Sequence, residues 1–159
     1  MRLGISDARE ASRACEEILA NAKAYNAAAI VEGVLVEEMI TDGVEVLVGF
    51  KQDPRFGPMV TFGPGGIFVE LLRDISLRMA PLDEHDAMAM IRETKAYPLL
   101  TGFRGEQPRD VAALSQVLVA VSELAQDSRE ELSELDVNPC MVLPHGRGVR
   151  AVDALMVLK

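Results

Sequence analysis

The order of apolar and polar positions predicts a helix near the start of the chain. From Ser6, small or apolar residues recur at helical spacing as far as about Tyr25, and the Ser6 hydroxyl can serve as the N-cap. Residues 2–5 come before this helix and are typical of the end of a strand. Because a domain seldom begins on such a strand end, we expect residues 1–159 to be the C-terminal part of a domain in a longer chain.

The next part of the chain alternates extended runs with turn-forming residues. Apolar and β-branched residues predict strands at 33–40 and 44–50, and the turn at 41–43 predicts that the two form a hairpin. A third strand is expected at 59–62, followed by a Gly-rich loop at 63–66 and a strand around 76–80. Because these connections are too short for crossover helices, the predicted sheet is antiparallel.

Helices and a final hairpin complete the pattern. Helices are predicted at about 83–94 and 109–126, the second with a clear apolar side at 3.6-residue spacing. The last hairpin pairs residues 135–143 with 149–157 around a turn at 144–148. The expected fold class is therefore α+β, an antiparallel sheet with packed helices, in a single domain that spans residues 1–159.

Composition narrows the classes of function. The chain has 159 residues, 49% of them hydrophobic, which is enough for a buried core. A net charge of −9 argues against a nucleic-acid partner, because phosphate backbones are bound by clustered Lys and Arg. No apolar run approaches the roughly 18 residues of a membrane span, and the start lacks a signal peptide, so we expect a cytoplasmic protein without a membrane partner. Cys15 and Cys140 lack metal-ligand spacing and are expected to be buried apolar residues.

The main candidate for chemistry lies at the start of the final hairpin. Side chains alternate along a strand, so Glu134, Asp136 and Asn138 share one face while Leu135 and Val137 point into the core. An antiparallel strand with one solvated face gives the same pattern. Spacing alone therefore leaves a structural and a functional interpretation open.

Asp153 on the return strand favours the functional interpretation. It is the only charged residue in 151–158, and a carboxylate in so apolar a strand needs a partner. If the loop spans residues 144–147, Asn138 and Asp153 are cross-strand neighbours on one face, whereas an odd-numbered loop without a bulge places them on opposite faces. Carboxylate and amide oxygens suit Mg²⁺ that also holds nucleotide phosphates.

Several motifs together resemble one family. The string Glu-Leu-Asp-Val-Asn-Pro at 134–139, with the later Asp in Ala-Val-Asp-Ala, resembles the closing motif of the ATP-grasp domain in ADP-forming acetyl-CoA synthetases and the succinyl-CoA synthetase β subunit. Other segments resemble the same family in the same order: Gly-Val-Leu-Val-Glu-Glu-Met (33–39), Gly-Val-Glu-Val (43–46), Asp-Pro-Arg-Phe-Gly-Pro (53–58), Phe-Gly-Pro-Gly-Gly-Ile-Phe-Val-Glu (62–70) and Leu-Thr-Gly-Phe-Arg-Gly (100–105). The resemblance covers nearly the whole chain and implies the C-terminal part of an ATP-grasp nucleotide-binding domain.

The resemblance implies a nucleotide site in the first half of the chain. Backbone groups around Glu38, Met39 and Ile40 would read the base edge, with Glu37 or Glu38 on the side of its exocyclic amine. Glu45 would contact the ribose hydroxyls. Glutamates are commonly exposed, so surface strand charge remains the alternative for these residues.

The resemblance also implies a metal and phosphate end. Asp136, Asn138 and Asp153 would hold Mg²⁺, with Asp136 standing where the succinyl-CoA synthetase pattern has Glu. The backbone amides of Gly65 and Gly66 would let a phosphate approach, although a tight turn needs the same residues.

Arg104 and the two histidines are less specific candidates. Arg104 would contact phosphate, but an exposed loop arginine is commonly only solvated. His85 and His145 have polar neighbours in the sequence, and we expect both to be solvated.

The function implied is that of the ATP/ADP- and Mg²⁺-binding half of an acid–thiol ligase. Such an enzyme exchanges acyl-CoA, ADP and phosphate with acid, CoA and ATP through a phosphohistidine carried elsewhere. The implied partners are the nucleotide and the CoA-binding and phosphohistidine-bearing domains, in the same chain or a partner subunit, and the piece alone should be inactive. Two alternatives remain at this point: a regulatory synthetase-like region of a protein-lysine acetyltransferase, and a non-catalytic interaction module of the same fold.

Overall fold

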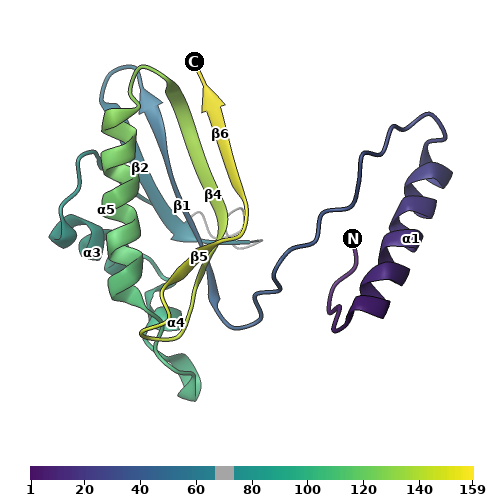
Figure 1. Ribbon diagram of the computed structural model, residues 1–159. Helices are drawn as coiled ribbons and strands as arrows, with labels where there is room; N and C mark the ends of the chain where they lie inside the picture. The colour runs from purple at the N-terminus through teal and green to yellow at the C-terminus, as the bar shows by residue number, and fades with distance from the viewer. Residues whose placement is uncertain (67–73) are drawn as a thin grey trace. The chain divides into compact units, whose positions relative to one another are not determined.

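The computed structural model describes residues 1–66 and 74–159. These form two compact units, Met1–Thr41 and Asp42–Lys159, each of which is described by itself (Figure 1). The family-like segment at 62–70 therefore extends beyond the described residues after Gly66.

The N-terminal unit contains α1 (Ala8–Tyr25), which confirms the first predicted helix. Its N-cap is Asp7 rather than Ser6, and the Asp7 carboxylate accepts a hydrogen bond from the Glu10 N–H at 2.8 Å. Ser6 instead donates through its hydroxyl to the Glu10 carboxylate at 2.8 Å. Because the helix begins at Ala8, Asp7 occupies the N-cap position, and its carboxylate can accept the N–H three residues later.

The strands predicted at 2–5 and 33–40 are absent, so the prediction of a 33–40/44–50 hairpin is wrong. Residues 30–40 have neither helix nor strand, and the side chains of Leu35 and Val36 are each 81% exposed. A β-branched run becomes a strand only where another strand pairs with it. The strand that starts at Val44 has both of its edges paired with other strands, which leaves no edge for residues 33–40.

The C-terminal unit is built on a six-stranded sheet of described residues. Its strands are β1 (Val44–Asp53), β2 (Gly57–Pro64), β3 (Ser76–Met79), β4 (Leu132–Val142), β5 (Val149–Ala151) and β6 (Ala154–Leu158). The order is β3-β2-β1-β4-β5, with β6 also paired to β4. Each of these pairings is antiparallel, as predicted.

Helices α3 (Glu84–Glu93) and α5 (Val111–Asp127) lie on one face of this sheet (Figure 1). Both were predicted, and each has an aspartate N-cap, Asp83 and Asp110. Short helical turns α4 (Tyr97–Leu100) and η1 (Phe103–Gly105) connect them. The main core residues come from β1, β2 and α5: Val46, Val48, Phe50, Val60, Phe62, Leu114 and Leu118. This arrangement confirms the α+β class. Among the described residues of this unit, no helix lies on the opposite face of the sheet, which we call the open face.

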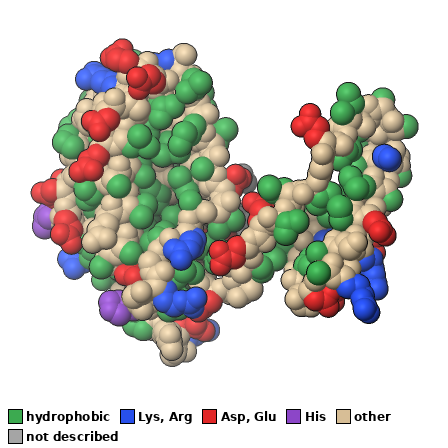
Figure 2. Space-filling view, in the orientation of Figure 1, with side chains coloured by type: hydrophobic (Ala, Val, Ile, Leu, Met, Phe, Trp, Pro, Cys, Tyr) green, Lys and Arg blue, Asp and Glu red, His purple; other side chains and the backbone are tan. Residues whose placement is uncertain are grey.

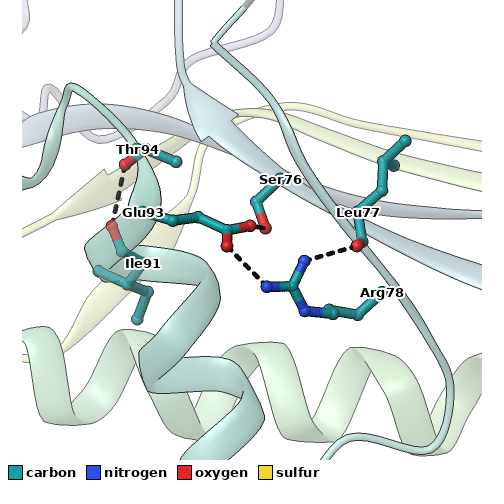
Figure 3. A network of polar contacts seen from close by, with 6 residues as sticks. All are labelled: Ser76, Leu77, Arg78, Ile91, Glu93 and Thr94. Atoms are coloured by element: carbon teal, nitrogen blue, oxygen red, sulfur yellow. Dashed lines mark hydrogen bonds and ion pairs between the residues drawn. The ribbon is translucent and has the colours of Figure 1, made fainter.

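Edge strand β3 is held to the end of α3 by a group of polar contacts (Figure 3). The Glu93 carboxylate accepts hydrogen bonds from the Ser76 hydroxyl and from the Arg78 guanidinium, the latter at 2.6 Å. These bonds lower the pKa of Glu93, the bond from Arg78 having the largest effect. An ionised Glu93 therefore links β3 to the C-terminal end of α3.

The surface of the C-terminal unit keeps some apolar side chains exposed. Figure 2 shows hydrophobic side chains gathered over the C-terminal unit. The exposed large hydrophobic residues include Leu124 of α5 and Met156 and Leu158 of β6. Within the described residues, no helix has the length and apolar character needed to cross a bilayer.

Candidate functional site

The candidate site begins on β4, where side chains alternate as predicted. Leu135 is buried on the helix-covered face, and Val137 packs against the same core. Glu134, Asp136 and Asn138 are half-buried and point to the open face. Strand geometry alone accounts for this separation.

The loop of the final hairpin has the even length that brings Asn138 opposite Asp153. The Leu143 N–H donates to the Gly148 carbonyl at 3.1 Å, which leaves residues 144–147 as the loop. Further along the same hairpin, the Asn138 N–H donates to the Asp153 carbonyl at 3.2 Å. The predicted cross-strand relation of these two residues is therefore confirmed, while their role as ligands stays a prediction.

The return strand differs from the prediction because it is broken at Val152 and Asp153, between β5 and β6. Opposite the break, β4 has a bulge relative to β1, where pairing shifts between Val46 with Cys140 and Val48 with Val137. Pro139 lies in this bulge and has no N–H for the ladder, which explains why a proline is tolerated inside a central strand.

Glu45, Gly65 and Gly66 lie beside Asn138. The Gly65 N–H donates to the Glu45 carbonyl at 2.9 Å, and the Gly66 N–H reaches the Asn138 side-chain oxygen at 3.4 Å. Gly66 has φ +62°, and a Cβ there would lie 2.5 Å from a Glu45 carboxylate oxygen. The turn itself therefore requires glycine at position 66. The fold brings Glu45, Gly65 and Gly66 together with Asn138, and we call these four residues the Asn138 group.

The electrostatics of Asp136 set it apart from an ordinary surface carboxylate. Burial raises its pKa most, and the negative charges of Glu134 and Asp153 raise it further. Its Oδ1 atom is buried and has no hydrogen-bond partner among the described residues. Glu134 by contrast forms an ion pair with Lys51, whose Nζ lies 2.9 Å from the Glu134 carboxylate. A buried polar atom without a donor needs an explanation, and a bound cation is one.

A shallow hollow of about 180 Å³ opens beside Asp136 on the open face. Sequence reasoning missed three of its lining residues, Gly49, Lys51 and Thr61. Gly49 pairs with Asp136, and a Cβ at Gly49 would lie 2.3 Å from the Leu135 carbonyl oxygen. The available signal was a glycine inside a strand, which often marks the close approach of another backbone.

The other predicted residues lie in different segments of the chain. Glu37, Glu38, Met39 and Ile40 lie in the N-terminal unit, in a segment without helix or strand. Arg104 is exposed in η1, and its guanidinium lies over the Phe103 ring, 5.2 Å from the ring centroid. Their proposed contacts with nucleotide stay predictions.

The histidines and cysteines add no chemistry to this site. His85 and His145 are exposed, as expected. Cys140 is buried, and burial raises its pKa to about 11, so it remains a neutral thiol. Cys15 is half-buried rather than buried.

Comparisons with known proteins agree on one family. A sequence profile described as an ATP-grasp domain matches residues 1–158. The β subunit of acetate–CoA ligase [ADP-forming] II from Pyrococcus furiosus is 44% identical over 157 residues, covering 99% of this chain and 66% of that protein. The 4-hydroxybutyrate–CoA ligase [ADP-forming] of Nitrosopumilus maritimus is 39% identical over 96% of this chain and 22% of its own length.

Solved structures agree with this result. A dinucleotide-forming acetyl-coenzyme A synthetase 1 of Ca. Korarchaeum cryptofilum, in complex with coenzyme A and Mg-AMPPCP, superposes with a TM-score of 0.86 at 40% identity. The match covers 99% of this chain and 67% of that one, and its phosphohistidine segment is described as pointing towards the nucleotide-binding site. Another structure of that enzyme, with coenzyme A and acetyl-coenzyme A, gives a TM-score of 0.89 at 44% identity. The chain thus spans about two thirds of the length of several proteins that it matches.

Proposed function

The chain belongs to the ATP-grasp domain family, and we propose that it supplies the ATP/ADP- and Mg²⁺-binding part of an acid–thiol ligase. The complete enzyme would interconvert acyl-CoA, ADP and phosphate with acid, CoA and ATP. The names of the relatives support this reaction class, because they include ADP-forming ligases for acetate and for 4-hydroxybutyrate.

The observation that carries the proposal is the buried, unpartnered Asp136 oxygen beside the Asn138–Asp153 pair. Asp136, Asn138 and Asp153 offer two carboxylates and an amide oxygen, which is a donor set that fits Mg²⁺. We assign the metal to these three residues. Glu134 is left out because its carboxylate is already paired with Lys51. A bound Mg²⁺ would neutralise charge on the terminal phosphates of the nucleotide.

The remaining contacts follow the family resemblance. We propose that backbone groups at Glu38, Met39 and Ile40 bind the base, with Glu37 or Glu38 on the side of its exocyclic amine. Glu45 would bind the ribose, and its place beside Gly66 and Asn138 supports a role near the metal end.

Phosphate contacts are proposed for the glycines and for Arg104. The Gly65 and Gly66 amides would face the phosphates, and the Gly66 N–H is only weakly engaged at 3.4 Å. Arg104 would supply a guanidinium for phosphate contact, and in this structure that group lies over the Phe103 ring.

Further domains would complete the reaction. We propose that a CoA-binding domain and a phosphohistidine-bearing domain, in the same chain or a partner subunit, supply CoA binding and the transfer of the phosphoryl group. The unpartnered Asp136 oxygen favours a ligand-binding role over a purely structural interaction module, because burying a carboxylate without a ligand has a cost.

Calorimetric titration of Mg²⁺-ADP and Mg²⁺-ATP tests the metal assignment. We expect Asp136→Ala and Asp153→Ala to weaken binding by about tenfold or more, because each removes a charged oxygen ligand. Asp127→Ala, at an exposed carboxylate at the end of α5, serves as the control and should bind like the wild type. Equal affinities in all four proteins would refute the assignment.

A further inference from the structure

Asp110 connects α5 to the hairpin that contains Asn138 and Asp153. It is buried, and one carboxylate oxygen accepts the Ala113 N–H at 3.2 Å as the N-cap of α5. The other oxygen accepts the Gly148 N–H at 2.9 Å, and the Asp110 N–H donates to the Leu143 carbonyl at 2.8 Å. Asp110 therefore holds Gly148 through its side chain and Leu143 through its backbone, and these two residues form the last pair of the hairpin before the loop.

Neighbouring backbone contacts reinforce this connection. Arg109 forms an isolated antiparallel bridge with Pro144, and the His145 N–H donates to the Pro108 carbonyl at 2.9 Å. The segment before α5 thus runs beside the beginning of the hairpin loop. The Arg109 guanidinium also donates to the Asp42 carboxylate at 2.8 Å, which ties the same segment to the residues that lead into β1.

The charge state of Asp110 suits this role. The Gly148 N–H lowers the Asp110 pKa most, with smaller contributions from the N–H groups of Ala113 and Gly146 and from His145. The carboxylate is therefore ionised at neutral pH and is a strong acceptor for both N–H groups.

The contact with Gly148 bears on where Asp153 lies. Counting from the Leu143–Gly148 pair, five further residues on each strand lead to Asn138 and Asp153. Only the three residues of β5 separate Gly148 from the break that contains Asp153. A slip of one residue would send the Asp153 side chain to the opposite face, away from Asp136.

We infer that Asp110 is a positioning residue for the metal site: by holding Gly148 and Leu143, it sets the hairpin register that places Asp153 opposite Asn138. The effect on Mg²⁺ rests on the proposed function, whereas the effect on register does not. Asp110 itself touches neither the metal ligands nor the nucleotide in this assignment.

The test compares two N-cap aspartates in the same protein. Asp110→Ala removes a cap and the Gly148 contact, whereas Asp83→Ala removes only the equivalent cap of α3, where the carboxylate accepts the Asp86 N–H at 2.7 Å. Hydrogen–deuterium exchange at the Gly148 and Asn138 amides reports the register directly. Titration with Mg²⁺ alone reports the metal site.

We expect Asp110→Ala to speed exchange at both amides by about tenfold and to weaken Mg²⁺ binding about fivefold. Asp83→Ala should change neither value. Asp110→Asn keeps an acceptor oxygen, so its exchange rates and Mg²⁺ affinity should lie between those of the wild type and Asp110→Ala. If Asp110→Ala does not fold, Asp110→Asn replaces it in the comparison with Asp83→Ala.

The outcomes separate the two proposals. Unchanged exchange at Asn138 in the Asp110 variants, or unchanged Mg²⁺ affinity despite faster exchange, would overturn the positioning role. A wild-type protein that binds no Mg²⁺, together with faster exchange at Asn138 in Asp110→Ala, would refute the proposed metal function while supporting the role of Asp110 in the register.

Discussion

At the scale of single residues, the site depends on a carboxylate in an unfavourable environment. Asp136 is held beside Glu134 and Asp153 with one oxygen unsatisfied within the described structure, and its pKa is raised by burial and by these charges. Within the described residues, Lys51 forms its ion pair with Glu134. The alternation that places Asp136 on the open face follows from the sequence, but the burial of its oxygen depends on tertiary packing, in which β4 lies between β1 and β6.

The raised pKa of Asp136 predicts a pH dependence with a definite sign. A carboxyl group whose folded pKa is above its unfolded value lowers stability when it ionises, so the metal-free protein should gain stability as pH falls through the raised pKa. Asp136→Asn should therefore stabilise the metal-free protein at pH 7 by about 1 kcal/mol, as expected for removing an unsatisfied buried charge. Urea unfolding with a chelator present measures this change.

Mg²⁺ should make the wild type more stable than Asp136→Asn. Because the metal binds the ionised carboxylate, Mg²⁺ should stabilise the wild type and leave Asp136→Asn nearly unchanged, and its affinity should fall on acidification. A variant whose stability rises with Mg²⁺ as much as that of the wild type would contradict the role of Asp136.

At the scale of elements, the contact between β1 and β4 shapes the open face. Gly49 allows the β4 backbone to come close to β1 and leaves the hollow beside Asp136. The sequence indicated both strands, but their pairing joins residues about 90 positions apart, such as Gly49 and Asp136. No local pattern of turns or periodicity specifies which two strands pair over that separation.

Gly49→Ala should destabilise the sheet. The added Cβ would lie 2.3 Å from the Leu135 carbonyl oxygen, which is backbone, so the two strands must separate. We expect a loss of roughly 1–3 kcal/mol in the free energy of unfolding, as for overpacking in a well-packed interior. Gly33→Ala is the matched control, because a Cβ at Gly33 meets no atom within 4 Å. Equal stability of the two variants would show that β4 does not approach β1 so closely.

At the scale of the whole molecule, the open face is shallow for a nucleotide site. The hollow of about 180 Å³ is smaller than the roughly 300–1,000 Å³ of small-molecule pockets. The chain also spans about two thirds of the length of the Pyrococcus furiosus β subunit that it matches. Both observations support the proposal that other parts of a ligase enclose the nucleotide.

The 159-residue chain by itself should therefore show no ligase activity. The assay supplies ATP, CoA and acetate and measures acyl-CoA formation through the ADP that is released. A mixture that also contains CoA-binding and phosphohistidine-bearing domains of a related enzyme is the positive arm. Turnover by the purified chain alone would contradict this prediction.

The sequence by itself determined the features that depend on short-range order. Helical periodicity located α1, α3 and α5, turn residues indicated the β1–β2 and β4–β5 connections, and strand alternation put Asp136 and Asn138 on one face. Motif order added the family. The tertiary structure decided the rest: residues 33–40 form no strand because both edges of β1 are paired, and the four-residue loop held by Asp110 brings Asp153 opposite Asn138. Strand partners, register and the desolvation of Asp136 depend on contacts between residues far apart in sequence, and no local pattern encodes them.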